Sequence, residues 1–138
     1  MDGRCQCGRI TFTTPSKEPE VLYQCHCTQC RHQSSSAFGI SAAFPNFKLP
    51  EYPEGMIGTY DRPNSKGFTR GYFCTNCGSR LVHQWFKEDG TVGGFAIKGG
   101  CLDGLTKEMM RNAKHIWTKE AIVEIPEGAE AYEGEPPF

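Results

Sequence analysis

Seven of the eight cysteines in this chain lie in three short clusters, and these clusters constrain what the chain can fold into more than any other feature. The clusters are Cys5-Gln6-Cys7, Cys25-His26-Cys27-Thr28-Gln29-Cys30 and Cys74-Thr75-Asn76-Cys77. Cysteines two or three residues apart do not readily form a disulfide with each other, but their thiolates can bind one tetrahedral metal ion together. The seven cysteines would serve two zinc ions, four on one and three on the other. A zinc ion with three protein ligands keeps a free coordination position, as catalytic zinc ions do.

Length and charge narrow the class of protein. With 138 residues, the chain is expected to form a single zinc-binding domain, residues 1–138, with little hydrophobic core to spare. Metal binding would offset that shortage, because its free energy adds to the free energy of folding. The formal net charge of -1 and the lack of a basic stripe argue against a nucleic-acid partner.

The sequence has no apolar segment suited to a signal peptide or a membrane span, so a cytoplasmic protein without a membrane partner is expected. Thiols stay reduced in the cytoplasm, and cysteine clusters there indicate metal sites rather than disulfides. Iron–sulfur ligation competes on cysteine count alone, but the spacings do not match the usual ferredoxin patterns.

Strand patterns dominate the chain and predict a mainly β fold. Strands are expected over residues 9–13, 21–23, 37–44, 56–60, 68–73, 79–86, 91–97 and 122–125. Segments rich in glycine, proline, asparagine and aspartate separate several of them. The only helical pattern covers residues 105–112, and the acidic tail, residues 127–138, is expected to pack loosely.

The first and last cysteine clusters predict one closed, structural site. On an extended segment, the side chains of Cys5 and Cys7 would leave the same face. Cys74 and Cys77, followed by Gly78, have the pattern of a zinc knuckle, in which a turn points N–H groups at the sulfurs and glycine supplies a positive φ. Together the two pairs would join the first strand to the middle of the chain.

The middle cluster predicts a second site of a different kind. The sulfurs of Cys25, Cys27 and Cys30 can all reach one ion, but a fourth ligand from the same short segment is not expected. His26 would point away from Cys25 and Cys27 on an extended segment, so it is interpreted as a neighbour of the metal. Spacing alone leaves two readings equally open: an open three-cysteine site, or a structural site that Cys101 or a distant histidine completes.

Five motifs occur together in a specific order. They are Gly3-x-Cys5-x-Cys7-Gly8, Cys25-His26-Cys27-x-x-Cys30-Arg31, Phe73-Cys74-x-x-Cys77-Gly78-Ser79, Gly99-Gly100-Cys101-Leu102-Asp103 and His115-Ile116-Trp117. This series resembles the family of glutathione-dependent formaldehyde-activating enzymes, which includes centromere protein V, over nearly the whole chain. The chain departs from the family pattern at Ser34-Ser35-Ser36, where a glycine is usual, and at Cys101, where a threonine is usual.

The resemblance implies a β-tent fold, in which zinc clamps twisted antiparallel sheets. It also implies how the cysteines are shared between two Zn²⁺ ions per chain. A structural zinc would be bound by Cys5, Cys7, Cys74 and Cys77, and a catalytic zinc by Cys25, Cys27 and Cys30.

The chemistry of a three-thiolate zinc favours a sulfur substrate. Such a centre has a net charge of about -1, which makes it a weaker Lewis acid than zinc bound by three neutral histidines. It suits a soft fourth ligand such as a substrate thiol, whose pKa falls on coordination, so that the thiolate can add to an aldehyde. The resemblance implies the namesake reaction, glutathione plus formaldehyde giving S-hydroxymethylglutathione, a carbon–sulfur lyase activity. Two alternatives stay open: a zinc enzyme acting on another small molecule without glutathione, and a non-catalytic, zinc-stabilised binding module.

A few further residues are candidates for roles beside the metal. Arg31 could bind a substrate carboxylate through its fork of donors. His26 and His32 could move protons near the metal. Cys101 is either a small buried apolar residue or part of the pocket wall. The residues expected to be structural or in the core are His83, Trp85, Phe86 and Trp117.

Overall fold

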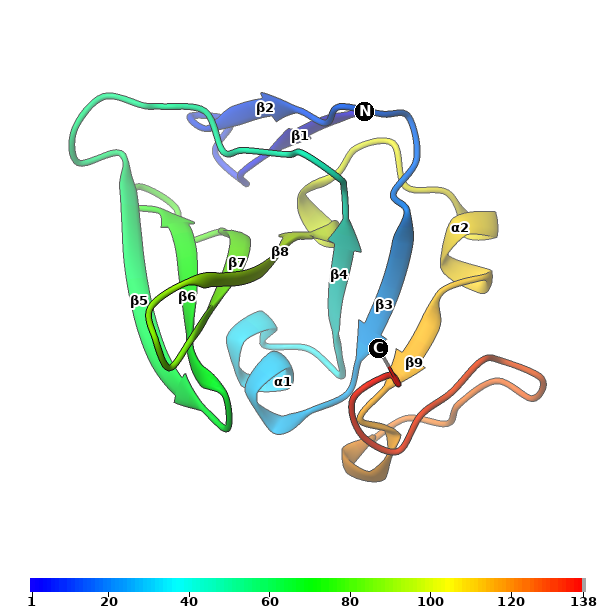
Figure 1. The fold of residues 1–138 in the computed structure, drawn as a ribbon. Coiled ribbons are helices and arrows are strands. Elements are labelled where there is room, and N and C mark those ends of the chain that lie inside the picture. The colour runs from blue at the N-terminus through cyan, green and yellow to red at the C-terminus, as the bar shows by residue number, and fades with distance from the viewer. Residues whose placement is uncertain (138) are drawn as a thin grey trace.

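The computed structural model of the protein describes residues 1–137, and its largest element is a curved seven-stranded sheet (Figure 1). In order across the sheet, the strands are β5 (Ile57–Asn64), β6 (Gly67–Cys74), β7 (Arg80–Lys87), β8 (Val92–Lys98), β4 (Gly39–Ala43), β3 (Val21–Cys25) and β9 (Lys114–Ile116). A second, two-stranded sheet pairs β1 (Asp2–Arg4) with β2 (Thr11–Thr13). The short helices are α1 (Thr28–Ser34) and α2 (Lys107–Arg111), with 3-10 turns η1 (Gly99–Cys101) and η2 (Thr118–Glu120). The mainly β fold class expected from the sequence is confirmed.

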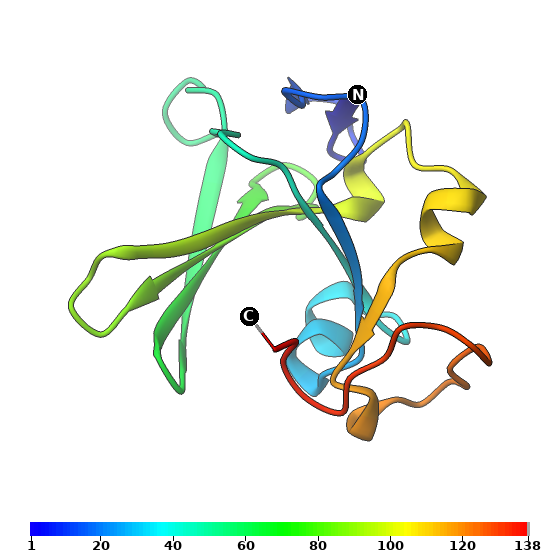
Figure 2. The same ribbon diagram turned by 45° about the vertical axis from the view of Figure 1, so that its right-hand side comes forward.

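Strand β8 joins the two halves of the large sheet. It pairs with β7 over most of its length, and its last residues, Ile97 and Lys98, pair with Ala42 and Ser41 of β4. All neighbouring strands are antiparallel except β3 and β9. In Figure 1 α1 lies between the β5–β7 part of the sheet and β3, and in Figure 2 it lies at the lower end of β3.

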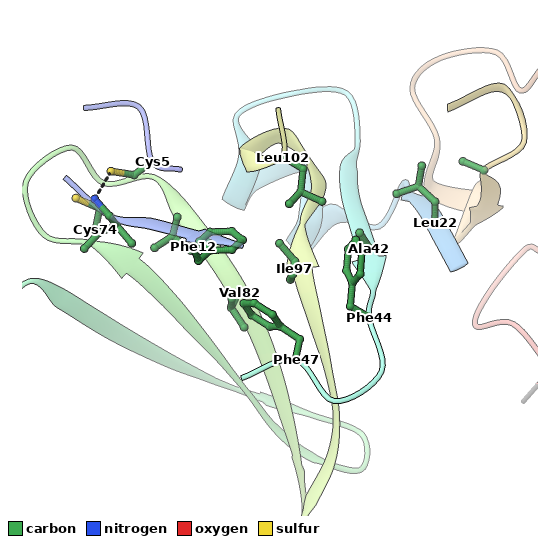
Figure 3. Packing of buried hydrophobic residues seen from close by; sticks show 13 residues of the cluster. Cys5, Phe12, Leu22, Ala42, Phe44, Phe47, Cys74, Val82, Ile97 and Leu102 are labelled. Atoms are coloured by element: carbon green, nitrogen blue, oxygen red, sulfur yellow. Dashed lines mark hydrogen bonds between the residues drawn. The ribbon is translucent and has the colours of Figure 1, made fainter. Parts of the chain in front are cut away.

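The hydrophobic core lies where the small sheet covers the large one. Figure 3 shows Phe12 of β2 beside Phe47, Val82 and Ile97, and the ring centroids of Phe12 and Phe47 are 5.5 Å apart. The buried cysteines Cys5 and Cys74 lie at one end of this cluster, so the core and the first cysteine group share a boundary. Apolar burial therefore fixes the chain segments that carry these sulfurs.

Most of the predicted strands and the helix over residues 105–112 are present, but three expectations are wrong. Residues 122–125 form no strand: Ile122 and Val123 lie in a bend and are exposed. The sheet ends with β9 instead, and the tail, expected to pack loosely, hydrogen bonds to it: the His115 N–H donates to the Glu130 carbonyl at 2.8 Å. Trp85 is 40% exposed rather than buried, because it lies on β7 near the tip of the β7–β8 hairpin. Phe86 and Trp117 are half-buried.

Helix α1 was not expected from the sequence, because it is too short to show an apolar repeat. Its boundaries follow local rules. Cys27 is the N-cap, its sulfur accepting a hydrogen bond from the Cys30 N–H, and Ser35 ends the helix in the left-handed conformation at φ 52°. Neither α1 nor any other helix among residues 1–137 has the length and apolar character needed to cross a membrane.

Candidate functional site

Four cysteine sulfurs from two distant segments meet beside the core: those of Cys5, Cys7, Cys74 and Cys77. All four lie within 4.8 Å of one another, with Cys5 and Cys7 sulfurs 3.5 Å apart and those of Cys7 and Cys74 3.8 Å apart. Four thiolates at about 2.3 Å around a tetrahedral zinc ion would have their sulfurs about 3.8 Å apart. The group can therefore hold a metal ion with every coordination position filled by the protein.

Two glycine-containing turns aim these sulfurs. Gly78 has φ 78°, and its N–H donates to the Cys74 carbonyl at 2.8 Å, as the knuckle pattern predicts. The segment from Cys5 to Cys7 is also a turn, so the expectation of an extended segment is wrong. Gly8, at φ 76°, allows this turn, and the Ile10 N–H donates to the Cys5 sulfur at 3.2 Å. The pKa of the Cys77 thiol falls to about 5, first because the Ser79 hydroxyl hydrogen bonds to its sulfur.

The second group lies at the junction of β3 and α1. Cys25 ends the strand, Cys27 caps the helix and Cys30 lies in its first turn, and their sulfurs are within 4.8 Å of one another. Cys25 and Cys30 are buried, and Cys27 is half-exposed. Hydrogen bonding to the Cys25 and Cys30 thiols lowers the pKa of the Cys27 thiol. Within residues 1–137, no other cysteine, histidine or carboxylate joins this group at that distance.

The histidines and the arginine of the middle motif have distinct surroundings. His26 is buried, and its Nε2 lies 3.0 Å from Nδ1 of His115, with the two rings nearly parallel. Burial lowers the pKa of both imidazoles, so the pair is neutral, and His26 is a neighbour of the sulfurs. His32 is exposed. Arg31 is half-buried, and its Nε has no hydrogen-bond partner in the described chain.

A cavity of about 470 Å³ lies between the two cysteine groups: Cys77 of the first group lines it, and Gly39, also in its wall, borders the Cys30 sulfur of the second. Its walls include Ser34 to Ser36, Gly39, Arg80, Lys98 and Cys101. Both departures from the family pattern, the serine run and Cys101, thus line the same cavity. The Cys101 thiol donates to the Arg80 carbonyl at 3.2 Å, and burial raises its pKa to about 11. Arg31 is not among the lining residues, although the sequence pointed to it as the substrate contact.

Sequence reasoning missed Lys98, a buried cation near the Cys30 sulfur. Only 5% of Lys98 is exposed, and its Nζ donates to the Ser41 hydroxyl at 3.2 Å. A β-carbon on Gly39 would lie 3.2 Å from Lys98 Nζ and 3.5 Å from the Cys30 sulfur, so both atoms border the same glycine. The available signal was a lysine that directly follows the apolar run of β8, since strands of this kind seldom end on a buried charge.

The comparison with protein families agrees with this geometry. A family model described as glutathione-dependent formaldehyde-activating enzyme matches residues 1–120, which include both cysteine groups, Arg80 and Lys98. The resemblance inferred from the motif order is confirmed. No curated protein matches the chain closely enough to add a narrower assignment.

Proposed function

Because the chain belongs to the family of glutathione-dependent formaldehyde-activating enzymes, we propose that it is a zinc-dependent carbon–sulfur lyase acting on the thiol adduct of a small aldehyde. Glutathione and formaldehyde are the first pair to test. The observation that carries the proposal is the three-cysteine group, which has no fourth protein ligand among residues 1–137 and whose Cys30 sulfur borders Gly39 in the cavity wall. Cys25, Cys27 and Cys30 would hold the catalytic zinc, and Cys5, Cys7, Cys74 and Cys77 the structural one.

Zinc bound to three thiolates would lower the pKa of a substrate thiol, so that its sulfur is nucleophilic at neutral pH. In the direction of adduct formation, the thiol loses its proton, its sulfur forms a bond to the aldehyde carbon as the C=O π bond opens, and the carbonyl oxygen gains a proton. Lysis of the adduct reverses both changes.

Lys98 is suited to the oxygen side of this reaction. Its ammonium group lies in the wall of the cavity, close to the Cys30 sulfur. A buried cation there would stabilise negative charge on the aldehyde oxygen and can donate a proton to it. Ser41, which accepts a hydrogen bond from Lys98, would fix the position of the ammonium group.

One observation favours a second candidate, a zinc enzyme that does not use glutathione. Ser34, Ser35, Ser36 and Cys101 all line the cavity, and these are the positions where the chain departs from the family pattern. A change in the cavity wall changes which small molecule fits while leaving the cysteines intact.

The test is a titration of the cobalt-substituted protein with glutathione, with and without formaldehyde. We expect a stronger sulfur-to-metal charge-transfer band on adding glutathione and faster adduct formation with the zinc protein. If neither effect is seen, the zinc enzyme that does not use glutathione becomes the favoured candidate.

A chelator should distinguish the two metal sites. A closed four-cysteine site offers a chelator no free coordination position, whereas a three-cysteine site does. Mild chelation is expected to remove one of two zinc equivalents and to abolish activity while the far-UV circular dichroism spectrum stays unchanged. Metal content measured on the purified and the treated protein checks this. Loss of both equivalents at the same rate would contradict the assignment of an open and a closed site.

We also propose a cellular compartment for the protein. A single domain that binds a small molecule, and neither nucleic acid nor membrane, would work in the cytoplasm, where its eight cysteines stay reduced.

A further inference from the structure

Two cations and a histidine gather on one face of the β5–β7 part of the sheet. Arg62 of β5 pairs with Thr69 of β6, and Gly71, two residues further along β6, pairs with His83 of β7. Side chains two residues apart leave the same face of a strand, so Arg62 and His83 share a face. Arg80, whose guanidinium lies against Gly71, lines the cavity together with Gly39 and Lys98, so this face is the one turned toward the cavity.

Arg80 reaches the same face over Gly71. A β-carbon at position 71 would overlap Nη1 of Arg80, so the guanidinium lies against the bare backbone of β6. Nη1 also lies 3.0 Å from Nε2 of His83. Arginine has no acceptor, so Nε2 must accept, which leaves the ring proton on Nδ1. Burial lowers the pKa of His83 to about 2, in keeping with a neutral ring that holds Arg80 in place.

Among residues 1–137, these cations have no acidic partner in an ion pair. The four ion pairs among the described residues are Arg4–Asp103, Lys66–Glu135, Arg70–Asp61 and Lys114–Glu130. None of them includes Arg62, Arg80 or Lys98, although the chain carries more acidic than basic residues. A three-thiolate zinc has a net charge of only about -1, so it does not balance three cations. The face therefore has a surplus of positive charge beside the cavity.

We propose that Arg80, seated on Gly71 and held by His83, binds a carboxylate of the substrate, so that the enzyme selects carboxylate-bearing thiols over neutral ones. Arg62, on the same face, adds positive charge for a second anionic group. The inference rests on the proposed function, because it assumes that a substrate thiol approaches the three-cysteine metal. His83 is then a positioning residue, whose effect passes through Arg80.

The experiment compares each thiol with its own ester. Cobalt-substituted protein is titrated with glutathione and its diethyl ester, and with 3-mercaptopropionate and its methyl ester, and the charge-transfer band gives each dissociation constant. We expect the acids to bind at least about tenfold more tightly than the esters, the ratio expected from one charge-assisted hydrogen bond. Arg80→Gln should bring that ratio close to one without weakening the binding of the esters.

Matched variants separate recognition from loss of structure. Arg70→Gln removes the same charge from the other face of β6, where Arg70 pairs with Asp61, and it should keep the preference for acids. Arg80→Lys keeps the positive charge but loses the paired N–H donors of the guanidinium group, so it should retain only part of the preference for acids. His83→Gln should lower affinity for the acids but not for the esters, a difference that mere destabilisation does not produce.

The outcomes are distinct. Equal binding of acids and esters by the unchanged protein would overturn the carboxylate proposal while the thiol chemistry stands. A preference that survives Arg80→Gln in folded protein would overturn it as well. If none of the four thiols changes the spectrum, the proposed function itself fails, and this inference fails with it.

Discussion

Cys74→Ser is expected to unfold or aggregate the protein. Cys74 is completely buried at the end of β6, and its sulfur lies within 4.8 Å of those of Cys5 and Cys7, so a zinc ion there would join β6 to the N-terminal turn. Loss of a structural zinc removes about 10 kcal/mol or more of binding free energy, which is comparable to the whole stability of a typical domain, about 5–15 kcal/mol. Circular dichroism, thermal unfolding and zinc content would measure the effect.

A matched control makes this prediction specific. Cys101→Ser changes the same atoms at a half-buried cysteine that belongs to neither group, and it should cost only about 1 kcal/mol. Cys74→Ser protein that keeps the unfolding temperature and zinc content of the unchanged chain would rule out a structural metal at this site.

The grouping of the sulfurs could be predicted from the sequence because metal ligation depends on short spacings. The pairs Cys5–Cys7 and Cys74–Cys77 and the triplet ending at Cys30 assemble as expected. The strands were also predictable, since alternation of apolar and polar residues marks a half-buried sheet. Zinc occupancy and the roles of the two groups remain predictions.

What the sequence did not reveal depends on contacts between distant segments. Strand β9 forms because residues 114–116 pair with β3 and with the tail, and its three residues carry no alternation long enough to recognise. The turn at Cys5 depends on the positive φ of Gly8, which a spacing rule does not include.

The cations of the site were missed for the same reason. Arg80 and Lys98 reach the cavity from β7 and β8, far along the chain from the middle motif, whereas Arg31 lies next to the last cysteine of that motif. Its closeness in sequence to the cysteines therefore favoured Arg31. The curvature of the sheet instead brings Arg80 and Lys98 to the cavity. Arg80 has no pattern of its own that indicates such a role, and the one signal for Lys98 is a charge directly after the apolar run of β8.

Cys27→Ser is expected to fold normally and to lose activity at least about 100-fold, since even changes to residues behind a metal ligand commonly cost 10–100-fold. The fold should persist because Cys27 is half-exposed and caps α1 through a hydrogen bond that its sulfur accepts from the Cys30 N–H. Serine is among the best N-cap residues, so its hydroxyl can accept the same hydrogen bond. The substitution nevertheless removes one of the three thiolates. Activity, circular dichroism and the cobalt charge-transfer band are the measurements.

The control and the contrary result both concern the same helix. His32→Asn alters an exposed neighbour on α1 and should leave activity and the cobalt spectrum unchanged, which also tests whether that histidine moves protons. Destabilisation of Cys27→Ser protein as severe as that of Cys74→Ser protein would mean that both cysteine groups are structural. In that event metal at both sites would serve folding, and a zinc-stabilised binding module would explain the chain better than an enzyme.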